Sequence, residues 1–457
     1  MSYLSDKLQA PINYFDLLIK FNSFLLILIT FFGLRIPFQT GNYVMDYSQE
    51  ASNIQNQIFY FYLFFSTLFI LIKRFNKTYS FIRAEKYLSL FILLCLGSAI
   101  WSDYSYLSIK RSFQLFVIFF VIVEVLINIE PGVLLKQLKI VVSLYLFYNL
   151  YACRFIPLAI DPTFGTWRGI EAHKNHLAQG SLYCLLSSVV FFKFDKTRLS
   201  KLYDVALMLL AVFITFKTKS STTFLAIVII VFLGFIFNIE KYFTERGFGR
   251  SLSGLMLLFV LSFIVIFIIF SSDIFASVPG YFGKDLTLSG RVPIWEYVWK
   301  DVEKKLWFGY GYQTYWLMGT QRIVLFAAAF EGFRVNEAHN GYIEIMLQLG
   351  IVGAIFFLFT LIAYIRRMLK LNSNLNLAIL ILITMLTLNY TESVFFKTGE
   401  MGFTTLFYMA SYTLISIYYF KLGKVNNDEE NHQKNFKPLV SEKYFSTQRR
   451  KNNIRNY

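Results

Sequence analysis

Charged residues are scarce in this chain of 457 residues, since only 16% are charged while 56% are hydrophobic. A soluble protein of this size could not bury so much apolar surface, and the mean hydropathy of +0.51 indicates a membrane protein. In a soluble protein the net charge of +16 would favour a nucleic-acid partner. In a membrane protein basic residues gather in cytoplasmic loops, so we expect no nucleic acid.

Cysteine and metal-ligand spacings are also missing. The three cysteines, Cys95, Cys153 and Cys184, lie in or beside apolar runs. The predicted outer loops contain no Asp-x-Asp, His-x-x-x-His or Cys-x-x-Cys spacing, so the sequence predicts no metal and no cofactor. No Gly-x-Ser-x-Gly elbow is present. The run 17–34 lacks an obvious small-residue cleavage site after it, so it is expected to be a first transmembrane helix.

Long apolar runs dominate what is present, and twelve of them can cross or nearly cross a bilayer. The predicted fold class is therefore all-α, a polytopic membrane bundle of about 12 transmembrane helices. The runs are approximately 17–34, 57–72, 87–101, 112–129, 138–158, 177–192, 202–216, 222–239, 252–271, 342–364, 375–390 and 402–420. Runs 57–72 and 202–216 are short and the weakest candidates, and tilted or partly re-entrant segments are the alternative for them.

Basic residues cluster in the even-numbered loops and in the tail, which predicts that these loops and both termini are cytoplasmic. The expected organisation is a cytoplasmic N-terminus (1–16), transmembrane helices 1–9 (17–271), a long outer loop (272–341), helices 10–12 (342–420) and a basic, disordered cytoplasmic tail (421–457).

The long ninth loop is expected to contain short helices and to carry chemistry, because every other loop is short. Pro293 opens a segment that continues to Leu306 in helical rhythm. One face of that segment collects Trp295, Val298, Trp299, Val302 and Leu306. Either this helix lies on the outer membrane interface or it packs only on protein.

Reactive side chains gather in the predicted outer loops. Three of the four histidines, His173, His176 and His339, fall in the fifth and ninth loops, which also contain Arg168 and Arg291; His432 is in the tail. An imidazole among cations suits a reaction with an anionic leaving group and an acceptor hydroxyl that must lose a proton. For Arg168 and Lys174, the alternative is that both side chains only reach lipid headgroups.

Further cations occupy the same predicted face. Lys174 follows His173 in the fifth loop, and the seventh loop reads Lys217-Thr218-Lys219-Ser220-Ser221. Basic residues outside the membrane run against the inside-positive bias, so they indicate an anionic partner there. Arginine suits phosphate oxygens with a planar fork of donors, and lysine offers a compact charge.

Several motifs in order resemble the O-antigen ligase and polymerase superfamily. They are Trp101-Ser102 before Arg111, Arg168-Gly169 with His173-Lys174-Asn175, Ser289-Gly290-Arg291 followed by Trp295, Gly309-Tyr310-Gly311, and His339-Asn340-Gly341-Tyr342 followed by Gly350-Ile351-Val352-Gly353. The resemblance covers most of the chain from about 95 to 395. It implies a metal-independent bacterial transferase that moves a glycan from undecaprenyl pyrophosphate to an acceptor on the outer face of the inner membrane.

The resemblance also implies residue roles. Arg291 and His339 match the pyrophosphate arginine and the proposed base of the long loop, so they are the predicted catalytic residues. Arg168, Lys174, Lys219 and Arg291 are the predicted pyrophosphate-binding residues, and Glu337, His173 and Asn340 are secondary candidates. Ligases carry an arginine at the seventh loop, where this sequence offers Lys217, Lys219 and Ser221.

Two properties of His339 are expected. Its imidazole is expected to be neutral near pH 7, with nearby arginines lowering its pKa and Glu337 opposing them. Attack by a deprotonated hydroxyl opposite the pyrophosphate would invert the anomeric centre. The alternative is that His339 only caps the helix beginning near Tyr342 or bonds a backbone carbonyl.

Three functions remain open from the sequence. The His173-Lys174-Asn175 motif resembles that of exopolysaccharide polymerases and favours a polymerase that joins undecaprenyl-pyrophosphate-linked repeat units. Membrane lipids are expected to contact the protein. A ligase would pass the glycan to lipid A core or to protein. A lipid-linked oligosaccharide flippase would also have about twelve helices but would more often bury charges in mid-helix; Glu124, inside run 112–129, is the clearest such charge.

Overall fold

The computed structural model describes residues 14–33, 54–162, 165–245, 291–317, 320, 323–326, 337–369, 375–393 and 395. The predicted runs 252–271 and 402–420, the start of the long loop, His432 and the basic tail lie outside these residues. Within the described ranges the chain is helical, with one isolated antiparallel bridge between Ile160 and Trp167 and no β-strand. The predicted all-α class is confirmed.

The helices are α2 (Tyr14–Phe32), α4 (Ile54–Lys73), α5 (Phe75–Ala84), α6 (Lys86–Gly97), η1 (Ser98–Ile100), α7 (Ser105–Asn128), α8 (Pro131–Phe155), η2 (Pro157–Ala159), α9 (Lys174–Phe194), α10 (Arg198–Thr218), α11 (Ser221–Glu245), α14 (Arg291–Lys304), α16 (Gly341–Met368) and α17 (Leu375–Thr391). Among the described residues, 8 helices are long and apolar enough to cross a membrane, and Lys86–Ile100 and Leu375–Thr391 are shorter apolar helices. Each lies on a predicted run, so the polytopic helical architecture is confirmed.

Several boundaries differ from the prediction. The short runs 57–72 and 202–216, the weakest candidates, are helices of 20 and 21 residues. The helix predicted at 112–129 begins earlier, at Ser105, and therefore includes Arg111. Helix α5 was not predicted, because its polar composition resembles that of a basic loop.

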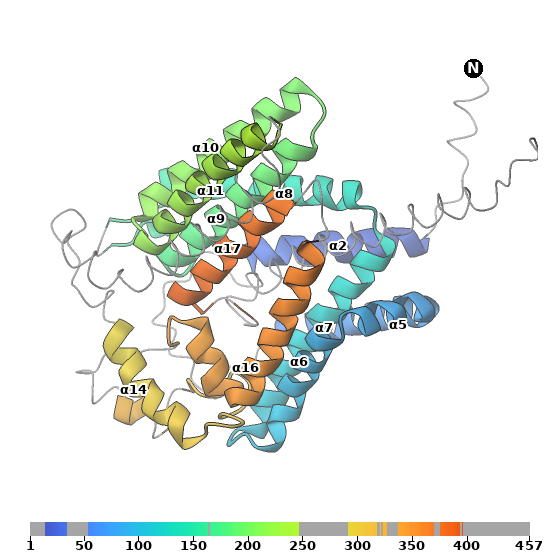
Figure 1. The fold of residues 1–457 in the computed structure, drawn as a ribbon, viewed down its shortest axis with the longest axis vertical. Helices are drawn as coiled ribbons and strands as arrows, with labels where there is room; N and C mark the ends of the chain where they lie inside the picture. The colour runs from blue at the N-terminus through green and yellow to red at the C-terminus, as the bar shows by residue number, and fades with distance from the viewer. Residues whose placement is uncertain are drawn as a thin grey trace, which may run out of the picture.

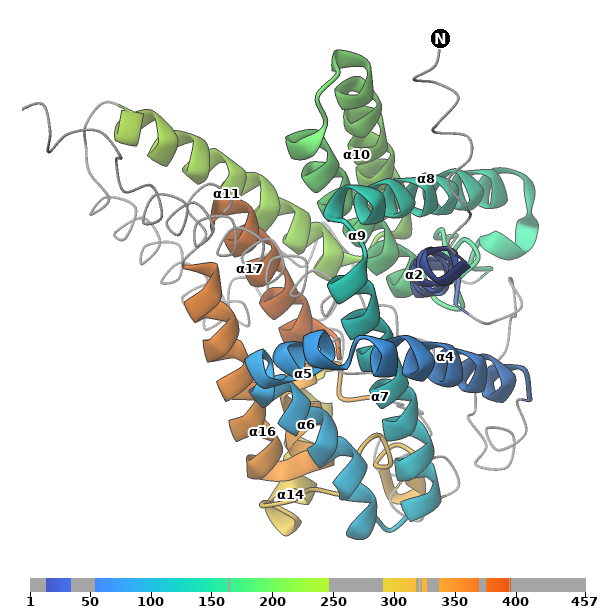
Figure 2. The same cartoon turned by 90° about the vertical axis from the view of Figure 1, so that its right-hand side faces the viewer.

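One apolar core joins most of the described helices. Helices α8, α10 and α11 lie at one end of the molecule, and α14 lies at the other, against the start of α16 (Figure 1). Turning the molecule shows α11 beside α17, and α6 between α7 and α16 (Figure 2).

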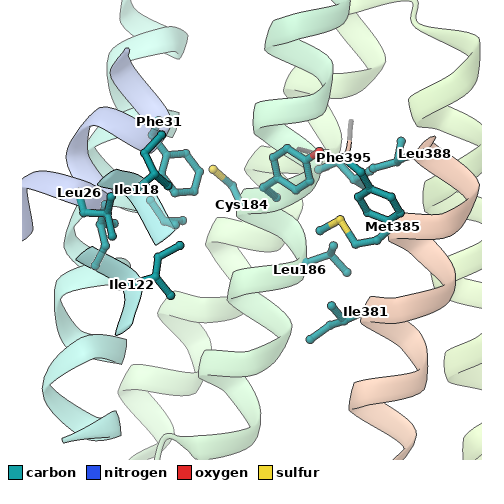
Figure 3. Packing of buried hydrophobic residues seen from close by; sticks show 14 of the residues in the cluster. Leu26, Phe31, Ile118, Ile122, Cys184, Leu186, Ile381, Met385, Leu388 and Phe395 are labelled. Atoms are coloured by element: carbon teal, nitrogen blue, oxygen red, sulfur yellow. The ribbon is translucent and has the colours of Figure 1, made fainter. Parts of the chain in front are cut away.

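Apolar side chains fill the spaces between these helices (Figure 3). Leu26 and Phe31 of α2 lie with Ile118 of α7, and Leu186 of α9 lies beside Met385 of α17. Cys184 is fully buried, and all three cysteines are free thiols within this core. This packing fixes the position of α9 relative to α17, and so the positions of their ends.

Several charged residues are buried among the described helices, and Glu124 and Asp204 are the most deeply buried of those within the bundle. Glu124 of α7 is fully buried and accepts hydrogen bonds from Asn22 Nδ2 at 3.1 Å and from Thr67 Oγ1 at 2.6 Å. A buried carboxylate needs such donors, because leaving it without them is costly. Glu124 therefore joins α2 and α4 to α7, as expected of a charge that pairs within the bundle.

Helix α16 is interrupted, although the run 342–364 reads as one continuous helix. Gly350 has φ 62° and ψ −160°, which breaks the α-helical hydrogen bonding around it. A segment of the long loop replaces the lost partners. Tyr310 N donates to Leu347 O at 2.8 Å, and Ile351 N donates to Leu306 O at 2.9 Å. The long loop is thus joined to α16 backbone to backbone.

The early motif Trp101-Ser102 and Arg111 has a structural explanation. Trp101 Nε1 donates to Phe308 O at 2.8 Å, and Ser102 Oγ lies 3.0 Å from Thr314 Oγ1. Arg111 donates to the carbonyl of Gln313. These contacts hold the Gly309-Tyr310-Gly311 segment against η1 and the start of α7.

Candidate functional site

Four helix ends meet where the predicted reactive residues lie. Helices α9, α14 and α16 begin there with Lys174, Arg291 and Gly341, and α17 ends there at Thr391. The N-terminus of a helix carries partial positive charge, so three such ends favour an anion nearby.

The backbone around His339 is held by three neighbours. His339 has φ 49°, a left-handed conformation that non-glycine residues rarely adopt. Ala338 N donates to a carboxylate oxygen of Glu344 at 2.6 Å, and Ala338 O accepts from Trp295 Nε1 at 2.8 Å. Asn340 caps α16 by accepting from Tyr342 N at 3.0 Å. Asn340 is therefore a positioning residue for the histidine.

The imidazole of His339 lies between two carboxylates. Its Nδ1 is 3.1 Å from Glu337 Oε1 and 3.1 Å from Glu392 Oε2. Burial alone would lower the pKa of His339, but the charges and hydrogen bonds of Glu337 and Glu392 outweigh it and raise the pKa to about 9. The expectation of a neutral imidazole near pH 7 is therefore wrong, because the nearest charges are carboxylates.

Glu392 also binds Arg291. Arg291 Nη2 donates to Glu392 Oε1 at 2.6 Å, and Nη1 donates to the carbonyl of Thr391. Burial would raise the pKa of Glu392, but the charges of Arg291 and His339 hold it below its usual range. The Arg291 and Glu392 side chains are only 11% and 3% exposed. The four side chains Arg291, Glu392, His339 and Glu337 form one charged network, here called the charge cluster.

The start of α9 adjoins the charge cluster. Asn175 Nδ2 donates to Glu392 Oε1 at 3.4 Å, and His173 accepts from Asn175 N as the cap of α9. Burial lowers the pKa of His173; the charge of Glu392 opposes this, and those of Lys174 and His339 add to it. The predicted convergence of the fifth and ninth loops is confirmed for these residues.

Arg168 has a different set of partners. Its Nε and Nη2 donate to Leu158 O at 2.8 and 2.6 Å, and its side chain is buried. Trp167 N donates to Lys217 O at 3.2 Å, so this stretch adjoins the turn between α10 and α11. Lys219 in that turn is exposed and has φ 53°. Among the described contacts, none joins Arg168 or Lys219 to the charge cluster.

Sequence reasoning missed Glu392. It follows an apolar run directly and is one of 28 acidic residues, so composition did not single it out. A usable signal was its place in the Thr391-Glu392-Ser393 stretch on the predicted outer side, the same side as His339 and Arg291. Glu344 was also missed; it accepts from Trp316 Nε1 at 2.6 Å as well as from Ala338 N.

The helix predicted at 293–306 is observed as α14 and packs on protein. Ile294, Val298 and Val302 are buried against Tyr310, Tyr315 and Ala338. Trp299 and Leu306, predicted to share that apolar face, are 45% and 37% exposed. The alternative of packing on protein therefore holds for the stripe formed by Ile294, Val298 and Val302.

Glu337, His339 and Glu392 offer ligand atoms within 4.8 Å of one another, an arrangement that could hold a metal ion. Spacing along the sequence could not reveal it, because Glu392 comes from a different helix end. Arg291 already binds Glu392 in this cluster. A cation there would face a guanidinium, so the donor set fits a proton on the imidazole better than a metal.

The fold and the charge cluster define a polytopic helical membrane protein with an imidazole held by carboxylates beside an arginine. The family model for O-antigen ligase matches residues 206–358. The chain is 33% identical over 85 residues to the exopolysaccharide production protein ExoQ of Rhizobium meliloti (strain 1021), a match that covers 18% of this chain and 20% of that protein. Both matches support the O-antigen ligase and polymerase superfamily, so the resemblance predicted from the motifs is confirmed.

Proposed function

We propose that this protein polymerises undecaprenyl-pyrophosphate-linked oligosaccharide repeat units into an exopolysaccharide or O-antigen chain. The observation that carries the proposal is the carboxylate-bound imidazole of His339 next to Arg291. The reaction would occur on the outer face of the bacterial inner membrane, with both termini of the chain in the cytoplasm.

His339 acts as the proton acceptor in this proposal. Glu337 and Glu392 hold its Nδ1, which leaves Nε2 to take the proton of an acceptor hydroxyl. The hydroxyl oxygen then bonds to the anomeric carbon as the bond from that carbon to the pyrophosphate oxygen breaks. The electron pair leaves with the pyrophosphate, and the anomeric centre is inverted.

Arg291 stabilises the departing pyrophosphate. Two of its guanidinium nitrogens bind Glu392 and the Thr391 carbonyl, and its remaining N–H donors stay available for a phosphate oxygen. Because the Arg291–Glu392 pair is buried, a phosphate that draws Arg291 away also frees Glu392 for His339. The lipid-linked donor is also bound by basic residues around the charge cluster in this proposal. Lys174 contributes from the start of α9, and Arg168 and Lys219 contribute from beside the α10–α11 turn.

A second candidate is ligation of a finished glycan to lipid A core. The match of residues 206–358 to the O-antigen ligase model favours it. The similarity to an exopolysaccharide production protein supports the polymerase.

Purified protein in detergent, supplied with an undecaprenyl-pyrophosphate-linked repeat unit as sole substrate, separates these candidates. A polymerase forms a ladder of products; a ligase forms product only after lipid A core is added; a flippase forms none. Turnover is expected to persist in EDTA.

The variant His339→Gln tests whether His339 is the proton acceptor. It should fold and bind the donor while turnover falls by roughly 10²–10⁴. If His339→Gln kept near-normal turnover, Glu337 would be the next proton acceptor to test. If His339→Gln lost thermal stability together with activity, the histidine would be structural.

A further inference from the structure

The outer side of α14 carries a groove that the proposed chemistry does not use. It encloses about 510 Å³ and is lined by Trp295, Glu296, Trp299, Lys300 and Glu303 of α14 and by Ile343 of α16. Trp299 is 45% exposed there. A large exposed aromatic side chain in a hollow with convergent polar groups is typical of a ligand site.

One wall of the groove is continuous with the charge cluster. Trp295 lines the groove and also donates from Nε1 to Ala338 O at 2.8 Å. Ala338 directly precedes His339. Ile343, which also lines the groove, donates from its backbone N to Asn340 Oδ1 at 3.3 Å. A ligand lying along the groove would therefore end beside the residues that hold the imidazole.

The chemistry of the lining points to a polyhydroxylated ligand. The faces of indole rings carry partial negative charge and attract the polarised C–H groups on the face of a sugar ring. Carboxylates accept hydrogen bonds from hydroxyls, and a lysine donates them. Among the described residues, no ion pair engages Glu296 or Glu303. Two carboxylates against one lysine disfavour a phosphate or an anionic lipid headgroup.

We propose that this groove binds the acceptor oligosaccharide, with Trp299 stacking on a sugar ring and Glu296 and Glu303 accepting hydroxyl hydrogen bonds. The inference rests on the proposed function, because it supplies the acceptor hydroxyl to His339. The outer-leaflet lipid surface is the competing occupant, and the test separates the two.

The probe is the oligosaccharide that mild acid releases from the lipid-linked pool of cells making this protein. It lacks the pyrophosphate leaving group, so it can bind only as an acceptor. Binding to the full chain in detergent is measured without donor. Trp299→Ala should weaken the affinity about tenfold, Glu303→Gln should weaken it less, and Trp299→Phe should stay close to wild type because it retains an aromatic face.

Trp307→Ala is the matched control, since Trp307 is 63% exposed and lies outside the groove. It should bind the oligosaccharide as the wild type does. Equal affinity for wild type and a folded Trp299→Ala, checked by melting temperature, would overturn the assignment.

Lipid discs containing brominated phosphatidylcholine test the competing occupant. Subtracting the tryptophan fluorescence of Trp299→Phe from that of the wild type gives the emission of Trp299. Bromine should not quench this emission if Trp299 faces a water-filled groove. Strong quenching of that difference would show Trp299 in the bilayer and would also overturn the assignment.

Turnover distinguishes a failure of this inference from a failure of the proposed function. At fixed donor, Trp299→Ala should raise the KM for the released oligosaccharide and leave kcat and the donor KM unchanged. If the wild type showed no turnover but bound the oligosaccharide in a way that depends on Trp299, the proposed transferase function would be contradicted and the proposed groove site supported. Normal turnover with unchanged acceptor KM would contradict the groove alone.

Discussion

The fifth and ninth loops each contribute a motif arginine, but the two arginines have different partners. Arg291 binds the buried carboxylate of Glu392, whereas Arg168 binds the carbonyl oxygen of Leu158. A carbonyl orients a guanidinium and leaves its charge unbalanced, whereas a carboxylate neutralises it. Among the described residues, the ninth-loop arginine is therefore part of a buried ion pair, whereas the fifth-loop arginine is held by a backbone carbonyl.

Arg291→Ala is expected to have the largest effect. Removing Arg291 leaves the carboxylates of Glu337 and Glu392 with only the His339 imidazole between them, and breaking a buried ion pair in this way costs about 3–5 kcal/mol of stability. The melting temperature of the purified protein should fall, and turnover should be lost. Arg291→Lys keeps a positive charge, so it should recover part of the stability but remain impaired in turnover, because the two-pronged geometry is gone. Full activity in a stable Arg291→Lys would contradict this part of the account.

Glycines in the two loops extend the comparison. Gly309 has φ +65°, and an added Cβ would lie 2.6 Å from Leu347 O, a backbone atom of α16. Gly309→Ala should destabilise the protein by about 2–3 kcal/mol. Gly169 has φ +62°, but its added Cβ would meet the Asn149 side chain rather than backbone, and would displace the oxygen that accepts from Ile170 N. Gly169→Ala should cost about 1–2 kcal/mol.

Gly234 of α11 is the control for both substitutions, because nothing lies within 4 Å of its added Cβ. Gly234→Ala should leave the melting temperature equal or slightly higher. If Gly169→Ala were the more damaging of the two loop variants, the backbone junction at Gly309 would not be the stronger constraint.

Arg168→Lys should have a smaller effect. A lysine retains a charge beside the α10–α11 turn but cannot reproduce the two bonds to Leu158 O. The KM for the lipid-linked donor should rise about tenfold, with little change in melting temperature. Measuring initial rates against donor concentration at saturating acceptor gives this KM. An unchanged donor KM in both Arg168→Lys and Arg168→Ala would remove Arg168 from the pyrophosphate site.

Much of the architecture follows from the sequence, because long apolar runs have few stable alternatives to a membrane helix. The gathering of His173 and His339 was also predictable from their loops. The interruption of α16 at Gly350 was not, since its missing hydrogen bonds are supplied by residues some forty positions earlier in the chain. A glycine within an apolar run gives no sign of that partner.

The charge state of His339 also could not be predicted from the sequence. Sequence proximity suggested that arginines would dominate, with Glu337 as a weaker term. The register at the end of α17 brings Glu392 to 3.1 Å from the imidazole instead. Electrostatic interaction depends on distance in space, so Glu337 and, from 53 positions away, Glu392 together reverse the expected direction of the pKa shift.

The pH dependence of kcat/KM for the wild type tests the central claim most directly. With the pKa of His339 raised to about 9, the neutral base is a small fraction at pH 7 and increases as pH rises. If His339 accepts the proton, kcat/KM should rise about tenfold from pH 7 to pH 8 and level off above about 9. Glu337→Gln removes a carboxylate from Nδ1 and should move that rise to lower pH. A rate that falls through the same range would contradict the account and make the protonated imidazole the active form.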